Sequence, residues 1–301
     1  MDISQAIGST PLVKIEGIYV KLEHLNASGS VKDRIARYIV EKAERTGKLK
    51  PGYTIVEATS GNTGIAFSLQ AAVRGYKMVA FIPKNYSTER VKIMRAYGAD
   101  VRFVHKDCVR CAVEKAKRLA ARPRHYMPAQ FDNPWNIDEH FTGMGKEILG
   151  EVKDIDCFVA GVGTGGTLIG VIKAIRKKYP HAEAIAMEPD ECALLSGEGY
   201  GKHRIYGLHK NTCEHHQIEG IGDGFIPKLV RDNRKEIDEV VRIRSADALK
   251  EAKRLSKMGY FVGPSSGANF LAAKKMKRKY RNVVTLFCDR GDRYLSEGWY
   301  D

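Results

Sequence analysis

The sequence predicts an α/β protein with two doubly wound sheets and a cleft between them. Short apolar runs alternate with longer helical patterns over most of the 301 residues, as expected of parallel strands that carry helices on both faces. A single closed barrel is the alternative, but two strand groups lie on either side of residue 140, and the stretch 192–224 is long and irregular. Two sheets fit this pattern better, and ligands are expected at the carboxyl ends of their strands.

This pattern also predicts two domains. Residues 1–139 are expected to form the N-terminal part, in which a smaller domain covers about residues 36–139 and the residues before it pack partly on the other domain. Residues 140–301 are expected to form the larger C-terminal domain.

Each expected strand is a short, mostly apolar run, and each expected helix is a longer stretch that mixes apolar with charged positions. In chain order the elements are strand 19–23, helix 31–46, strand 54–57, helix 64–74, strand 78–82, helix 88–97, strand 101–104, helix 108–121, helix 139–150, strand 156–160, helix 167–178, strand 184–188, strand 239–242, helix 246–257, helix 267–279 and strand 283–287.

The composition excludes some classes of protein. The 50 Lys and Arg exceed the 36 Asp and Glu, for a net charge of +14, but they are spread over helical stretches such as 110–122, 173–178 and 274–281. Solvated helix faces explain this better than a nucleic-acid site, and such a surface still attracts anionic small molecules. There is no apolar run long enough for a membrane span and no signal-peptide layout, so we expect a cytoplasmic protein.

The six cysteines lack the spacing of a disulfide framework. Cys157 and Cys288 lie in apolar runs and are expected to be core thiols. Cys108 and Cys111 form a single C-x-x-C, which on its own is a weak signal for a redox pair or a zinc site. The remaining zinc ligands would be Cys213, His215 and His216. We predict no metal site.

Lys32 follows a Gly- and Ser-rich turn at 26–29 and opens a helical run. Lysine is the side chain that forms Schiff bases with carbonyl cofactors, and this position would hold its amine close to an electrophile. On the segment 30–34 alone, an ordinary exposed lysine is the better interpretation.

A glycine-rich loop at 161–167 joins an expected strand to an expected helix. Glycines let backbone N–H groups converge on an anion, and a helix N-terminus favours negative charge, so the loop predicts a phosphate site. Gly161, Gly163 and Gly166 also match G-x-G-x-x-G, with Glu188 near the distance expected of a ribose-binding acid. A dinucleotide site and a purely structural turn are therefore alternatives for this loop.

Polar residues gather at other strand-to-helix turns. The segment 57–64 offers hydroxyl and amide groups beside helix-start N–H groups, which suits a carboxylate, although a plain helix cap would use the same residues. The segments 130–134 and 263–267 are similar clusters.

These segments, in this order, resemble the cysteine synthase (O-acetylserine sulfhydrylase) and cystathionine β-synthase family of fold-type II pyridoxal-phosphate enzymes. The resemblance runs from residues 7–12 to residues 289–295 and so covers nearly the whole chain. It implies a tryptophan synthase β-like fold, with the cofactor pyridoxal 5'-phosphate between the two domains. Members of this family are usually homodimers, so the resemblance also implies a homodimer.

The resemblance also implies a role for each motif. Lys32 would form the internal aldimine and act as the base at the substrate Cα, Asn62 would bond the cofactor ring oxygen, and Ser265 would meet the pyridine nitrogen. The cofactor phosphate would be held by Gly163, Thr164, Gly165, Gly166 and Thr167. The substrate α-carboxylate would be held by Thr59, Ser60, Gly61, Thr63 and Gln130.

The implied reaction is a β-replacement that makes L-cysteine from an activated serine, O-acetyl-L-serine first, and sulfide through an α-aminoacrylate. Asp223 stands where the family has a small apolar residue, so it is a candidate catalytic acid for using serine, or cysteine hydrolysed to serine and sulfide. An ordinary loop aspartate is the alternative.

Two further alternatives remain. O-phosphoserine is a possible donor, because the loop 200–216 is rich in basic residues that suit a phosphate leaving group. These residues are Lys202, His203, Arg204, His209 and Lys210. Against this donor, Glu219 stands where some phosphoserine-using relatives carry an arginine. A catalytically silent scaffold is disfavoured, since Lys32 and the segment 59–63 are both intact.

Overall fold

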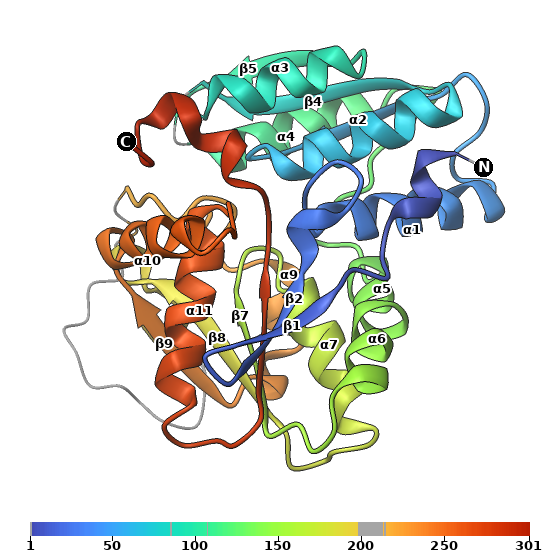
Figure 1. Ribbon diagram of the computed structural model, residues 1–301. Coiled ribbons are helices and arrows are strands. Elements are labelled where there is room, and N and C mark those ends of the chain that lie inside the picture. The colour runs from blue at the N-terminus through green and yellow to red at the C-terminus, as the bar shows by residue number, and fades with distance from the viewer. Residues whose placement is uncertain (1, 85, 107, 198–212, 214) are drawn as a thin grey trace.

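The computed structural model describes residues 2–84, 86–106, 108–197, 213 and 215–301, and it contains two sheets with helices on both faces (Figure 1). The six-stranded sheet has the order β1-β2-β10-β7-β8-β9, and the four-stranded sheet has the order β5-β4-β3-β6. All neighbouring strands are parallel except β1 and β2. The predicted α/β class with two largely parallel sheets is confirmed.

The strands are β1 (Leu12–Ile15), β2 (Ile18–Leu22), β3 (Thr54–Ala58), β4 (Lys77–Pro83), β5 (Asp100–Val104), β6 (His125–Tyr126), β7 (Cys157–Gly161), β8 (Glu183–Pro189), β9 (Glu239–Ile243) and β10 (Val283–Phe287). The α-helices are α1 (Lys32–Arg45), α2 (Asn62–Arg74), α3 (Thr88–Ala96), α4 (Val109–Ala120), α5 (Trp135–Thr142), α6 (Met144–Glu151), α7 (Gly166–Arg176), α8 (Leu194–Gly197), α9 (Lys228–Asp232), α10 (Ser245–Lys257) and α11 (Pro264–Met276).

Several elements differ from the sequence prediction. The short strands β1 and β6 and the short helices α8 and α9 were not expected, and the single helix expected at 139–150 is divided into α5 and α6 at Gly143. A Cβ at Gly143 would lie 2.4 Å from Oε1 of Glu139, so this glycine marks a close approach between consecutive turns. The pattern of apolar and charged residues does not show this close approach, so it does not predict the division of the helix.

Strand β7 shows why the larger sheet is buried on both faces. Successive side chains of a strand point to opposite faces. Phe158 and Ala160 join the apolar cluster that includes residues of α6 and α7, whereas Cys157 and Val159 join the cluster that includes residues of α10 and α11. A continuous apolar run is therefore what a central parallel strand requires.

The chain passes between the two sheets more than once (Figure 1). The hairpin β1–β2 belongs to the six-stranded sheet, through the pairing of β2 with β10. The 3-10 helix η5 (Gly291–Glu297) returns to the four-stranded side, where Ser296 bonds Glu89 of α3. The predicted division near residue 139 remains a prediction. No helix in the described part of the chain is long and apolar enough to cross a membrane.

Candidate active site

A cleft forms where β3, β7 and β10 end, and it collects segments from both sheets. The predicted site residues that line it are Lys32, Ser60, Asn62, Thr63, Gln130, Gly163, Thr164, Gly165, Thr167, Asp223 and Ser265. Three predicted residues, Thr59, Gly61 and Gly166, do not line the cleft, although their neighbours in the chain do. The parallel strands thus bring together motifs that are far apart in the sequence, as expected of carboxyl-end sites.

Lys32 is the first residue of α1 and faces the cleft. Burial lowers the pKa of its amine, an effect that Cys288, Asp289 and Asp223 oppose through their charges. A lowered pKa increases the share of neutral amine at neutral pH, and the neutral amine is the nucleophile.

The start of α1 is fixed by a buried ion network two residues after Lys32. The Arg34 side chain is 1% exposed, and it pairs with Glu23 at 2.6 Å and with Glu147 of α6 at 2.7 Å. Glu23 precedes α1 in the chain and Glu147 belongs to α6, so the network ties the start of α1, and with it the Lys32 amine, to two other segments.

The segment 59–63 forms a tight turn that leads into α2. The Thr59 hydroxyl accepts N–H groups from Gly61 at 2.8 Å and Gly64 at 2.9 Å, and the residue is fully buried, so its hydroxyl shapes the turn. Gly61 has a φ of +142°, a conformation that favours glycine. A Cβ there would also lie 2.1 Å from Cδ of Arg90.

Gln130 joins this turn to the end of β3. Its Nε2 donates to the Ala58 carbonyl at 3.0 Å, and its Oε1 accepts from the Thr63 hydroxyl at 2.7 Å. The arrangement places hydroxyl and amide groups beside the first turn of α2, where a carboxylate would be favoured.

The glycine-rich loop packs too closely for a side chain at Gly163 or Gly166. A Cβ at Gly163 would lie 2.5 Å from the Gly220 carbonyl oxygen, and one at Gly166 would lie 1.9 Å from Oδ1 of Asn136. Asn136 also donates to the Thr164 hydroxyl at 3.0 Å. The loop leads directly into α7, so the N–H groups of the first helical turn are free of intrahelical acceptors and suit an anion.

Asp223 lies in a turn between two glycines that both have positive φ. Part of the residue is exposed, but its carboxyl lies in the cleft, where burial raises its pKa to about 6 and the charge of Lys32 opposes the shift. A carboxyl with such a pKa exchanges protons near neutral pH. Ser265 is buried in the first turn of α11.

Two charged groups at the cleft were missed by the sequence analysis. Arg90 of α3 is buried and forms an ion pair with Glu219, which lines the cleft. Asp289 follows β10 and bonds Asn62. Neither residue stands in a motif that predicts these partners, and only the fold brings each pair together.

The cysteines correct the sequence prediction. Cys108 is bonded to Cys111 and Cys192 to Cys213, so two disulfides exist where no framework was expected. Cys157 is a buried core thiol, as predicted, but Cys288 lines the cleft, where burial raises its pKa to about 12.

The zinc interpretation of these cysteines finds no support. Within residues 2–84, 86–106, 108–197, 213 and 215–301, no group of three or more His, Cys, Asp or Glu side chains is placed to hold a metal ion. The basic residues proposed for a phosphate leaving group lie outside the described residues. They are Lys202, His203, Arg204, His209 and Lys210.

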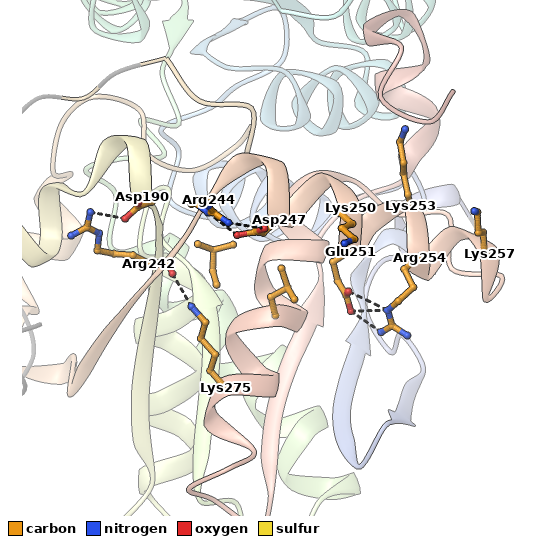
Figure 2. Close-up of a pocket in the computed structure, with 12 residues that line it drawn as sticks. Asp190, Arg242, Arg244, Asp247, Lys250, Glu251, Lys253, Arg254, Lys257 and Lys275 are labelled. Carbon is orange, nitrogen blue, oxygen red and sulfur yellow. Dashed lines mark hydrogen bonds and ion pairs between the residues drawn. The ribbon is translucent and has the colours of Figure 1, made fainter. Parts of the chain in front are cut away.

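A second hollow, of about 720 Å³, lies between β9, α10 and α11, away from the cleft (Figure 2). Many of its charges are paired internally: Arg242 with Asp190, Arg244 with Asp247, and Arg254 with Glu251. None of the predicted site residues lines it, so the cleft is the candidate active site.

The chain is similar to known proteins over nearly its whole length. Residues 3–289 match the family described as pyridoxal-phosphate dependent enzyme. A cysteine synthase of Staphylococcus aureus (strain Mu50 / ATCC 700699) is 42% identical over 314 residues, which cover 99% of this chain and 96% of the relative.

Two solved structures are similar to the whole fold. An O-acetylserine dependent cystathionine beta-synthase from Helicobacter pylori has a TM-score of 0.91 at 36% identity, and the match covers 100% of this chain and 99% of that one. A hydrogen sulfide-producing enzyme from Fusobacterium nucleatum has a TM-score of 0.89 at 38% identity, and the match covers 99% of this chain and 91% of that one.

Proposed function

Because the chain belongs to the family of pyridoxal-phosphate-dependent enzymes, we propose that it makes L-cysteine from O-acetyl-L-serine and sulfide by β-replacement. The observation that carries the proposal is Lys32, whose amine has a lowered pKa in a cleft that also contains a phosphate-type loop and a carboxylate-type turn. The family assignment also replaces the dinucleotide interpretation of residues 161–167.

The cleft fits the cofactor. The loop at Gly163 and Gly166 has no room for side chains and opens toward the start of α7, as a phosphate requires. Bound pyridoxal phosphate supplies the electron-withdrawing ring that makes a Cα proton removable. In our proposal Lys32 holds the cofactor and takes that proton, Asn62 meets the ring oxygen, and Ser265 meets the ring nitrogen.

The substrate would be held from the opposite side of the cleft. Ser60, Thr63 and Gln130 would bind its α-carboxylate, with Thr59 and Gly61 keeping the turn in shape. Closure of this turn over the carboxylate would exclude water before the leaving group departs.

The experiment compares cysteine formation from sulfide with three donors, O-acetylserine, serine and O-phosphoserine, using purified protein loaded with pyridoxal phosphate. We expect O-acetylserine to give the highest kcat/KM, and Lys32→Ala to lose both the yellow colour and the activity. Lys50→Ala, which changes an exposed lysine, is the matched control. A colourless wild-type protein after cofactor addition would refute the proposal, and so would turnover that favours serine or O-phosphoserine.

Asp223 supports a slower side reaction with serine or cysteine. Its pKa of about 6 allows it to carry a proton near the cleft and pass it to a departing hydroxyl or thiol group. Asp223→Ala should lower turnover of serine and cysteine more than that of O-acetylserine, whose acetate leaves without a proton. Equal loss with all three substrates would remove this role.

We also propose that the protein is a cytoplasmic homodimer, as is usual for the family. Sedimentation analysis of the loaded protein tests the assembly, and a monomer at micromolar concentration would contradict it.

A further inference from the structure

Asp289 connects three of the segments that carry predicted cofactor contacts. Its backbone forms a bridge to Ser30, two residues before Lys32, and its carbonyl accepts the N–H of Gly263 at 3.1 Å, two residues before Ser265. Its carboxylate accepts from Nδ2 of Asn62 at 2.6 Å. One fully buried residue thus touches the segments of Lys32, Ser265 and Asn62.

The amide of Asn62 is held from both ends. Asp289 accepts from its nitrogen, and the guanidinium of Arg293 donates to its oxygen. An ionised carboxylate only accepts hydrogen bonds, and a guanidinium only donates them. Turning the amide over would place oxygen against carboxylate and nitrogen against guanidinium, so a single orientation is favoured.

This orientation leaves one amide N–H of Asn62 unused. The amide nitrogen carries two hydrogens, of which Asp289 takes one. Asn62 lines the cleft that Lys32 and Ser265 also line. The remaining donor is therefore available to a group bound there.

The surroundings of Asp289 keep its carboxylate in place. Tyr294 donates to the same Oδ2 at 2.6 Å, and the other oxygen, Oδ1, has no hydrogen-bond partner. A Cβ at Gly263 would lie 2.3 Å from Oδ1, so the carboxylate is packed against the turn that leads to Ser265. Burying a carboxylate oxygen without a hydrogen-bond partner costs free energy. Such a cost is tolerated where the position of the carboxylate is important for function.

We infer that Asp289, with Arg293, is a positioning residue that fixes the Asn62 amide so that its N–H faces the ring oxygen of the cofactor. The inference rests on the proposed function, since it takes pyridoxal phosphate as the group in the cleft. An N–H at this oxygen stabilises its ionised form, whereas an amide oxygen there would favour the protonated form. The two forms absorb at different wavelengths, so the orientation can be read without turnover.

The test measures the visible absorption of the loaded protein in the absence of substrate, together with the dissociation constant for pyridoxal phosphate. Asp289→Asn can donate to Asn62, which permits the amide to turn over. We expect the short-wavelength band to rise at the expense of the long-wavelength band and the dissociation constant to increase about tenfold, equal to about 1.4 kcal/mol. Tyr294→Phe is the matched control, because it removes a bond to the same carboxylate oxygen but leaves the acceptor; its spectrum should match the wild type.

A second comparison separates positioning from a general loss of structure. In an Asn62→Ala background, Asp289→Asn should change the spectrum and the dissociation constant much less than it does with Asn62 present, because only its charge effect on Lys32 is left. An effect of the same size in that background, or a wild-type spectrum in Asp289→Asn itself, would overturn the inference.

If Asp289→Asn does not fold, Arg293→Met tests the same amide from its other end. It should shift the bands in the same direction, and an unchanged spectrum would again overturn the inference. Failure of cysteine synthesis with the spectral change intact would refute the proposed function and leave the inference standing.

Discussion

Removing the charge of Glu219 should destabilise the folded protein by about 3–5 kcal/mol, because it leaves a buried arginine without its counter-ion. The ion pair between Arg90 and Glu219 joins α3 to the segment that leads to Asp223, and the two side chains are 1% and 12% exposed. A pair this deeply buried is not screened by solvent, so the effect should be far larger than for a surface pair.

The other contacts of Arg90 cannot replace the lost charge. Its guanidinium lies 4.5 Å from the centre of the Tyr294 ring, an interaction worth about 2 kcal/mol when desolvated. The Ser60 carbonyl is 3.5 Å away, at the limit of a hydrogen bond, and the Arg90 Nε has no hydrogen-bond partner. Glu219→Gln therefore leaves a cation held mainly by the Tyr294 ring and the more distant Tyr86 ring, at 5.9 Å. The double variant with Arg90→Met leaves neither charge of this pair.

Urea unfolding of each variant at saturating pyridoxal phosphate measures the difference. The double variant should recover about 2 kcal/mol relative to the sum of the single variants. Asp232→Asn, which breaks the exposed Lys228–Asp232 pair with side chains 55% and 50% exposed, is the control and should cost about 0.5 kcal/mol or less. A Glu219→Gln protein within about 1 kcal/mol of wild type, or strictly additive variants, would refute the reasoning.

Three shorter predictions concern the rest of the cleft and its surroundings. Asp223 has a pKa raised from 3.8 to about 6, so the cofactor-free protein should lose up to about 3 kcal/mol of stability as the pH rises from about 4 through 6. Asp223→Asn should abolish this slope in urea unfolding at stepped pH, and an unchanged slope would contradict the assignment. Gly166→Ala should weaken pyridoxal phosphate binding and lower the stability of the fold, since its Cβ would lie 1.9 Å from a buried amide oxygen. A Cβ at Gly150 would have no atom within 4 Å, so Gly150→Ala should weaken neither the binding nor the fold. Cys213→Ser opens a disulfide that spans 21 residues and should cost about 3 kcal/mol in denaturant unfolding, more than Cys108→Ser, whose disulfide spans 3; equal losses would count against the crosslink.

The motifs that line the cleft can be recognised in the sequence because each of them is local. Lys32, the turn before Asn62, the loop at Gly163 and the turn at Ser265 each stand at a helix start, and parallel strands bring such turns to one edge. The physical reason for a Gly, Ser or Thr at these turns can be recognised from the neighbouring residues alone. The same reasoning missed β1 and β6, since both depend on pairing with distant strands for their hydrogen bonds.

The residues that the sequence does not predict are those whose partners are far along the chain. Asn62 and Asp289 are 227 positions apart, and neither carries a local pattern that indicates the other. The disulfide of Cys192 and Cys213 is missed for the same reason, because cysteine spacing cannot report proximity. Local turns thus supply the groups that would meet cofactor and substrate, whereas long-range charged contacts fix their orientation. Substitutions that alter the cofactor spectrum without touching the cofactor should therefore concentrate at such contacts, such as those of Asp289.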